Sequence, residues 1–139
     1  MKLAKTFALS LFILGMGVAV ANPVSSMAVV KFADIPVKTV VIKHPEAADT
    51  NKYFSTATAV TFWVYKAGSA DDVNKITQNL KKNSDVASCG AGKLTGDYQE
   101  MTVTLKTAKD KAFWAALFKS AGLGHIKINN NEIVEMDKM

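Results

Sequence analysis

Hydrophobic and polar residues alternate in two stretches of the chain, and this period of two predicts β-strands at residues 60–65 and 98–106. In a strand, successive side chains point to opposite faces of the sheet, so each stretch has one apolar face and one polar face. The apolar face is expected to carry Val60, Phe62, Val64, Met101, Val103 and Leu105. The opposite face is expected to carry Thr61, Trp63, Tyr65, Thr102 and Thr104.

Three shorter segments complete the predicted strands. Residues 37–43 are rich in β-branched residues and precede a proline, so they favour a strand that ends there. Residues 86–91 favour another short strand. Residues 125–136 form either one irregular strand or a tight hairpin turned by the three consecutive asparagines at 129–131. The polar residues 46–51 are expected to form a loop.

Two segments have the three-to-four residue spacing of helices. Ser69 is expected to cap the first, whose apolar positions are Val73, Ile76 and Leu80. The second helix is expected to open at residues 107–110 and to stop at two glycines. Its apolar stripe is predicted to comprise Phe113, Ala116, Leu117 and Ala121, widened by Trp114 and Phe118.

The order strand, helix, strand, strand, helix, strand predicts an α+β fold of ferredoxin-like βαββαβ type. Such a plait has a four-stranded antiparallel sheet with both helices on one face. We expect this domain at residues 57–139, preceded by a leading segment, residues 22–56, that supplies an additional N-terminal strand.

The first 21 residues have the pattern of a secretory signal peptide. Lys2 and Lys5 precede an uncharged apolar run, and small residues lead to a cleavage site after Ala21. The sequence therefore predicts an exported protein, periplasmic or extracellular, that has no stable membrane anchor once the signal is cleaved.

The charge pattern narrows the choice of partners. The 139 residues include 17 basic and 12 acidic ones, and all 17 basic residues are lysines. Loss of Lys2 and Lys5 with the signal peptide would lower the net charge from +5 to +3. Arginine is the residue that binds phosphate and guanine edges through two parallel hydrogen bonds. Its absence argues against a nucleic-acid partner.

Residues 59–136 resemble the heavy-metal-associated domain family. The resemblance lies in the element order and in the run Val73-Asn74-Lys75-Ile76, which is similar to the start of that family's first helix. The family binds soft metal ions through two cysteines in the loop that opens this helix. Here those positions hold Ser69 and Asp72, and neither supplies the thiolate that soft-metal affinity requires. The resemblance implies the fold, whereas Ser69 is expected to cap the helix and Asp72 to be an acidic residue of its first turn.

Cys89, the only cysteine, is the remaining candidate for metal or nucleophilic chemistry, with His44 or His125 as its partner. The predicted sheet puts Cys89 and His125 on opposite edges, roughly 14 Å apart at about 4.8 Å per strand step. His44 is not placed by this argument. Cys89 is expected to be a small, partly buried strand residue, and a metal site made by Cys89 and His44 is the alternative.

Two further motifs suggest binding loops but fit turns better. The glycines at 90, 92 and 96 do not have the spacing of a phosphate-binding loop and lie between two predicted strands. The asparagines at 129–131 could bind an ion, but a Ca²⁺ site needs several carboxylates, and only Glu132 is adjacent.

No catalytic constellation emerges, so we expect a non-catalytic binding or interaction module that needs no cofactor. Its interaction surface is predicted on the sheet face that carries Trp63 and Tyr65, with Thr61, Thr102 and Thr104. Either the leading segment folds across this face and buries it, which is the favoured interpretation, or the face is open to a partner. That partner would be another protein, a small molecule or a second copy of the chain.

Overall fold

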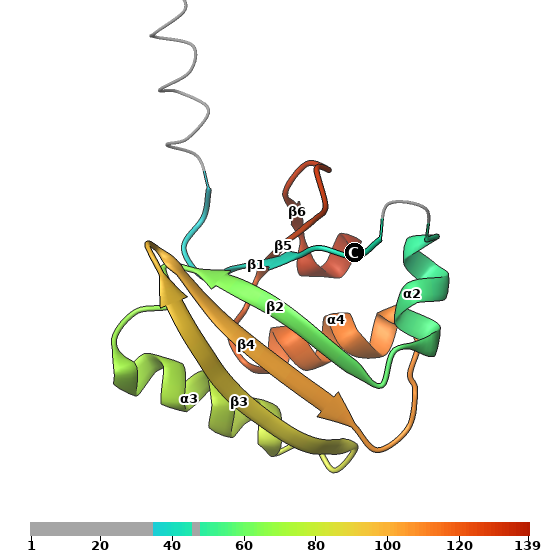
Figure 1. Ribbon diagram of the computed structural model, residues 1–139, viewed down its shortest axis with the longest axis horizontal. Helices are drawn as coiled ribbons and strands as arrows, with labels where there is room; N and C mark the ends of the chain where they lie inside the picture. Colours follow the sequence, from blue (N-terminus) through green and yellow to red (C-terminus); the bar gives the residue numbers. More distant parts are fainter. Residues whose placement is uncertain (1–34, 46–47) are drawn as a thin grey trace, which may run out of the picture. The chain divides into compact units, whose positions relative to one another are not determined.

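One β-sheet of six strands organises the part of the chain that the structure describes, residues 35–45 and 48–139 of a computed structural model. The predicted signal peptide and residues 22–34 of the leading segment lie outside the described residues. Residues from Ile35 to Met139 form one compact unit (Figure 1). The fold class is α+β, as the sequence predicts.

The six strands lie in the order β3-β4-β2-β1-β5-β6. Neighbouring strands are antiparallel, except that β1 and β5 are parallel. In chain order the strands are β1 (Thr39–Ile42), β2 (Ala59–Tyr65), β3 (Val86–Thr95), β4 (Tyr98–Leu105), β5 (His125–Ile128) and β6 (Val134–Glu135). The described helices are α2 (Thr50–Thr56), α3 (Ala70–Lys81), α4 (Lys111–Ser120) and the 3₁₀ helix η1 (Met136–Lys138).

The position of β1 corrects the prediction of a four-stranded antiparallel sheet. β1 lies between β2 and β5, which the predicted plait would make neighbours, and the sheet is mixed and has six strands. Val40 and Ile42 are fully buried, because the strand pairs on both sides and turns these side chains toward the helices. The expectation that this strand folds across the Trp63 face is therefore wrong, and β1 widens that face instead of covering it.

Helices α3 and α4 lie on the same side of the sheet (Figure 1). α3 begins after Ser69 and buries Val73, Ile76 and Leu80, as predicted. α4 begins after Asp110, whose side chain accepts a hydrogen bond from the backbone N–H of Phe113. Its buried stripe differs from the prediction. Ala116 is exposed, whereas the wide side chains Trp114 and Phe118 are fully buried with Leu117, because they fill more of the space above the sheet.

Helix α2 was not expected, since its first residues fall in the predicted loop. Asp49 caps it by accepting a hydrogen bond from the backbone N–H of Lys52. Phe54 is fully buried, and its ring centroid lies 6.3 Å from that of Trp114. Two apolar residues at 53 and 54 in a seven-residue helix are too few to give a helical period, so tertiary packing decides this element.

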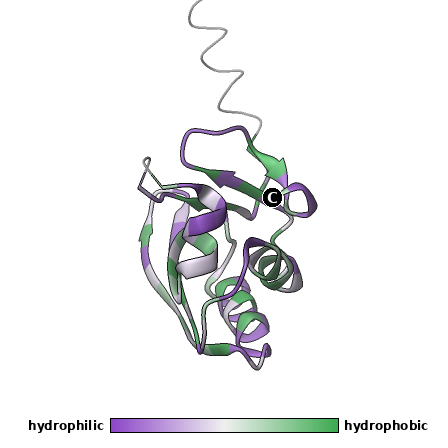
Figure 2. Cartoon of the chain, turned by 90° about the vertical axis from the view of Figure 1, so that its right-hand side faces the viewer, coloured by the Kyte–Doolittle hydropathy of each residue, from purple (hydrophilic) through white to green (hydrophobic). Residues whose placement is uncertain are grey.

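The core lies between the sheet and its helices. Hydrophobic and hydrophilic residues alternate along the strands (Figure 2), and the apolar set of β2 and β4 is buried as predicted. Phe62 contacts Phe118 edge to face, with ring centroids 4.9 Å apart. Trp114 Nε1 has no hydrogen-bond partner among the described residues, and an unpaired buried donor of this kind costs about 1–3 kcal/mol.

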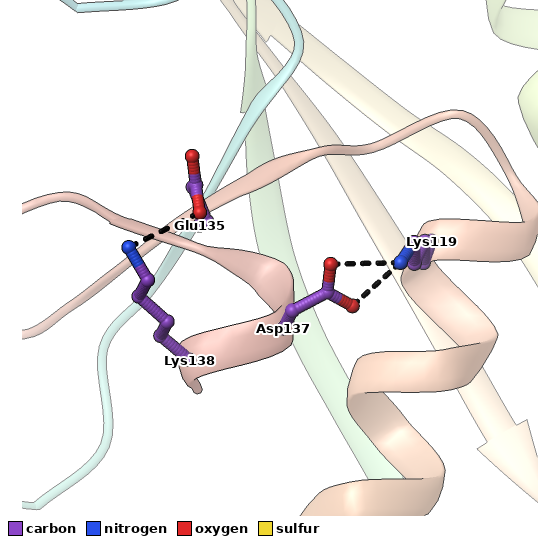
Figure 3. Close-up of polar contacts among 4 residues, drawn as sticks. All are labelled: Lys119, Glu135, Asp137 and Lys138. Carbon is purple, nitrogen blue, oxygen red and sulfur yellow. Dashed lines mark hydrogen bonds and ion pairs between the residues drawn. The ribbon is translucent and has the colours of Figure 1, made fainter.

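The C-terminal segment is a hairpin, the second of the two forms expected for residues 125–136. Asn129 has φ +52, a left-handed conformation that asparagine tolerates at a turn. Beyond β6, η1 buries Met136 against the core. Figure 3 shows the ion pair between Lys119 of α4 and Asp137, at 2.6 and 2.8 Å, which holds η1 on the helix from the solvent side.

Candidate functional site

The sheet face opposite the helices carries the predicted interaction residues. In the ladder Val41 is the partner of Trp63, and Trp63 is the partner of Glu100. The hydroxyls of Thr61 and Thr102 are hydrogen-bonded at 3.0 Å. These strands therefore bring Trp63, Thr61 and Thr102 onto one surface, which we call the open face.

The open face is hollowed where β1, β2 and β5 meet. The hollow has a volume of about 490 Å³, within the range of small-molecule sites. Trp63, Tyr98, Val41 and Ile133 give it an aromatic and aliphatic lining. The other lining residues are Ile35, Thr39, Lys43, Thr95, Lys127, Asn129 and Asn130. We call this concavity the Trp63 hollow.

Strand register explains why these side chains converge. Val41 lies opposite Trp63 on one side and opposite Lys127 on the other, so the three form one row across the sheet. Lys43 follows Val41 by two residues and belongs to the same face. The β5–β6 connection then brings Asn130 and Ile133 to the rim of the hollow.

His44 ties this rim to the rest of the fold. Its backbone N–H donates to Asn129 Oδ1 at 2.9 Å, and the backbone N–H of Asn129 donates to the carbonyl of Ile42 at 2.8 Å. The His44 ring stacks on Tyr53 of α2 with centroids 4.9 Å apart. The turn at Asn129 is thus held by β1 and, through His44, by α2.

The ring nitrogens of His44 are also engaged. Nδ1 lies 2.9 Å from the carbonyl oxygen of Pro45, which can only accept, so we assign the proton to Nδ1. Nε2 lies 3.1 Å from the hydroxyl of Thr50 and accepts from it. His44 is only 8% exposed. His44 is therefore a structural residue, and both of its ring nitrogens make hydrogen bonds.

Cys89 lies far from both histidines. It is on β3 and is 7% exposed, with its side chain on the helix side of the sheet. β3 is separated from β1 by β4 and β2, and from β5 by β1 as well. At about 4.8 Å per strand step, β3 and β1 are roughly 14 Å apart and β3 and β5 roughly 19 Å. Burial raises the pKa of the Cys89 thiol, which disfavours the reactive thiolate.

The loop before α3, where the resembling family has its cysteine pair, forms a helix cap here. Ser69 Oγ accepts from the backbone N–H of Asp72 at 3.3 Å, and Asp72 Oδ2 accepts from the backbone N–H of Ser69 at 2.9 Å. Hydrogen bonds from Ser69 lower the pKa of the Asp72 carboxyl. This reciprocal capping box confirms Ser69 as the cap and Asp72 as a first-turn acid, and it adds the contact of Asp72 with the Ser69 backbone.

A second hollow, of about 640 Å³, lies between the start of α3 and the β3–β4 hairpin. Its lining includes the small residues Ala67, Ala70 and Ala91. Leu94, which is 62% exposed, also lines it. Across residues 35–45 and 48–139, no group of three or more histidine, cysteine or acidic side chains is placed to hold a metal ion.

The Trp63 hollow only partly matches the predicted interaction surface. Tyr65 packs against Tyr98, with ring centroids 5.3 Å apart, and does not line the hollow. Thr61, Thr102 and Thr104 lie further along the open face. The sequence pattern does not place the lysines at 43 and 127 on this surface, and the asparagines at 129 and 130 are expected only as turn residues or ion ligands.

The glycines at 90 and 92 lie within edge strand β3, so the turn expected for them is wrong, and only Gly96 lies in the β3–β4 turn. None of the three lies in a loop before a helix, as a phosphate-binding loop requires. None of the helices in the described ranges is long and apolar enough to cross a membrane. No protein-family model, curated protein or solved structure matches the chain.

Proposed function

We propose that the protein is an exported, non-catalytic binding module whose ligand site is the Trp63 hollow. The observation that carries this proposal is the concavity on the open face, where an aromatic wall from β2 and β4 meets polar side chains from β1 and β5. An indole that is half-buried in the wall of a hollow of this size offers apolar contact area to a ligand.

The rest of the described chain supports a binding role over a chemical one. Burial disfavours the Cys89 thiolate, and both ring nitrogens of His44 are engaged. The distance of roughly 14 Å between their strands, at about 4.8 Å per step, gives no support to the alternative, a metal site made by Cys89 and His44.

We further propose that β2 to β5 are a ferredoxin-like plait into which β1 has been inserted, related to heavy-metal-associated domains but without their thiolate pair. β2, β3, β4 and β5 alternate with α3 and α4 in the plait's order, and both helices lie on one side of the sheet. The capping box of Ser69 and Asp72 gives those two positions a structural role.

Binding can be tested by NMR on the ¹⁵N-labelled mature chain, beginning at Asn22. The probes are 2-naphthoate and its uncharged counterpart 2-naphthylmethanol. The expected result is a saturable shift of the Trp63 indole N–H, while the fully buried Trp114 indole N–H stays unmoved as an internal control. The proposal fails if neither probe moves the Trp63 resonance up to millimolar concentration.

Matched variants locate the binding. Trp63→Ala should abolish the saturable shifts of neighbouring backbone resonances, including that of Val41. Thr104→Ala changes the same face outside the hollow and should leave probe binding unchanged. Equal loss in both variants would show that the hollow is not the binding site.

Export is tested separately. Expression of the full chain in a bacterium, followed by fractionation and intact-mass measurement, should give a periplasmic or secreted product that begins at Asn22. A product that stays in the cytoplasm with Met1 still attached would contradict export.

A further inference from the structure

Building on the proposed binding function, we infer that the ligand of the Trp63 hollow is a small organic anion. Its negatively charged group would lie at Lys43 and Lys127, and its apolar or aromatic body against Trp63 and Ile133. The inference comes from the distribution of charge around the hollow.

Lys127 lies on β5, and Lys43 directly follows the neighbouring parallel strand β1. Lys127 on β5 is one strand step from Val41, and Lys43 is two residues beyond Val41. One strand step and two residues separate the two Cα atoms by about 8 Å, so both long side chains can reach one anionic group. Among the ion pairs of the described residues, none involves Lys43 or Lys127.

Two carboxylates on strands of the same sheet, Glu100 and Glu135, have contacts elsewhere and do not line the hollow. Glu100 is the ladder partner of Trp63, but its carboxylate lies against Gly92 of β3, where Oε1 is 2.6 Å from the position a Cβ would take. Glu135 pairs with Lys138 at 3.2 Å, on the segment drawn in Figure 3. Of the described residues that line the hollow, two are cationic and none is acidic.

The part of the rim formed by Asn129 is held in place by hydrogen bonds within the protein, without a ligand. Asn129 makes three backbone or side-chain contacts with the end of β1, namely its N–H to Ile42, its Oδ1 to the His44 N–H and its Nδ2 to His44 Nε2 at 3.5 Å. A preformed rim reduces the entropy that a small ligand loses on binding. Asn130, the next residue, also lines the hollow.

The shape favours a small molecule over a polymer. A volume of about 490 Å³ lies within the range of small-molecule sites and is enough for a ligand with one or two rings. The lining combines three apolar side chains, Trp63, Val41 and Ile133, with two cationic ones, Lys43 and Lys127. A molecule with one anionic end and one apolar end matches both.

The probe pair described above tests this inference. 2-Naphthoate and 2-naphthylmethanol share a ring system and differ in charge. We expect 2-naphthoate to bind about tenfold more tightly, because each ammonium adds a charge-assisted contact. In the variant that combines Lys43→Gln and Lys127→Gln, this preference should fall below about twofold, whereas the affinity for the alcohol should change little.

A matched control has the same net charge as the Lys43→Gln and Lys127→Gln double variant. Lys93→Gln combined with Lys106→Gln removes two exposed lysines that do not line the hollow. This control should keep the preference for the anion. If both double variants lose the preference equally, the attraction is a property of the whole surface and the inference is overturned.

The remaining outcomes separate the inference from the proposed function. Equal binding of the two probes at Trp63 overturns the anion preference and leaves the binding function standing. Binding of neither overturns both. A Trp63 resonance that shifts on dilution of the protein alone, with no effect of either probe, would assign the hollow to a second copy of the chain and overturn the inference.

Discussion

The two faces of the sheet are built from the same strands but perform different tasks. Phe62 and Trp63 are consecutive residues of β2, yet Phe62 is fully buried against Phe118 while Trp63 forms part of a concave wall. On one face the helices fill the space, so every side chain contributes to stability. On the other face, the ladder partners of each side chain and the β5–β6 connection determine where the surface is concave. The strand pattern marks the apolar face, and the helices that pack on it make it the core.

The largest difference between the faces is expected when the two aromatic residues are truncated. Phe62→Ala should lower the free energy of unfolding by about 3–5 kcal/mol, because it leaves a cavity in close-packed surroundings. Trp63→Ala should cost less than about 2 kcal/mol, since its side chain is only half-buried. Urea denaturation followed by circular dichroism measures both values.

Phe62→Leu is a smaller truncation and keeps this comparison measurable if the alanine variant does not fold. Equal losses at positions 62 and 63 would contradict the contrast between the faces, because they would require the open face to be packed as tightly as the core.

The same contrast can be measured in β1. Ile42→Ala should lower the free energy of unfolding by about 3 kcal/mol, because Ile42 is fully buried between sheet and helices. Val41→Ala, on the open face, should cost about 1 kcal/mol. Denaturation of both variants also tests the position of β1, since a strand outside the sheet would make the two losses similar and small.

The sequence predicts most elements but not how β1 is arranged. The period of two at 60–65 and the spacing of Val73, Ile76 and Leu80 follow from local geometry, which is why β2 and α3 agree with the prediction. The insertion of β1 depends on which strands leave room between them, a property of the assembled sheet. The register of α4 likewise depends on the volumes of Trp114 and Phe118, which hydrophobicity alone does not rank.

A third contrast concerns the neighbours Ser88 and Cys89 on β3. Cys89 is buried, and burial raises the pKa of its thiol, so iodoacetamide at neutral pH should alkylate it about tenfold or more slowly than in the urea-unfolded chain. A variant that combines Ser88→Cys with Cys89→Ser moves the thiol to the neighbouring position, which is exposed. Mass spectrometry should then show alkylation close to the unfolded rate. Rapid alkylation of native Cys89 would contradict its burial.

The smallest effect is expected at the capping box of α3. Ser69→Ala should cost about 1 kcal/mol of unfolding free energy, and Ser84→Ala, which changes an exposed serine outside the helix, should cost almost nothing. The loss in the Ser69 variant should be measured by urea denaturation.

Asp72 makes the same cap depend on pH. Its pKa is lowered in the folded state, so its contribution is complete above the unfolded value of about 4 and is lost as pH falls through the folded value. The stability difference between the wild type and Asp72→Asn should therefore shrink as pH falls below about 4. A difference that stays constant from pH 7 to 2 would show that the carboxylate has no part in the cap.

The candidate site is less predictable than the fold. Trp63 is found by alternation, because one aromatic residue on a polar face stands out. Lys43, Lys127 and Asn129 become site residues only when β1 and β5 are adjacent, and nothing local to positions 43 or 127 shows that adjacency. Tyr65 shares the pattern of Trp63, yet its ring packs on Tyr98, so the prediction was right about its face and did not resolve its role.

The place of β1 in the sheet also bears on how the chain folds as it is made. β1 is the first described strand along the chain, and its parallel partner is β5; His44, just after β1, is bonded to Asn129, 85 positions later. Contacts between residues so far apart in sequence slow folding, because the intervening chain must be ordered before they form. A growing chain therefore cannot complete the centre of its sheet, or the rim of the hollow beside it, until synthesis has passed residue 129.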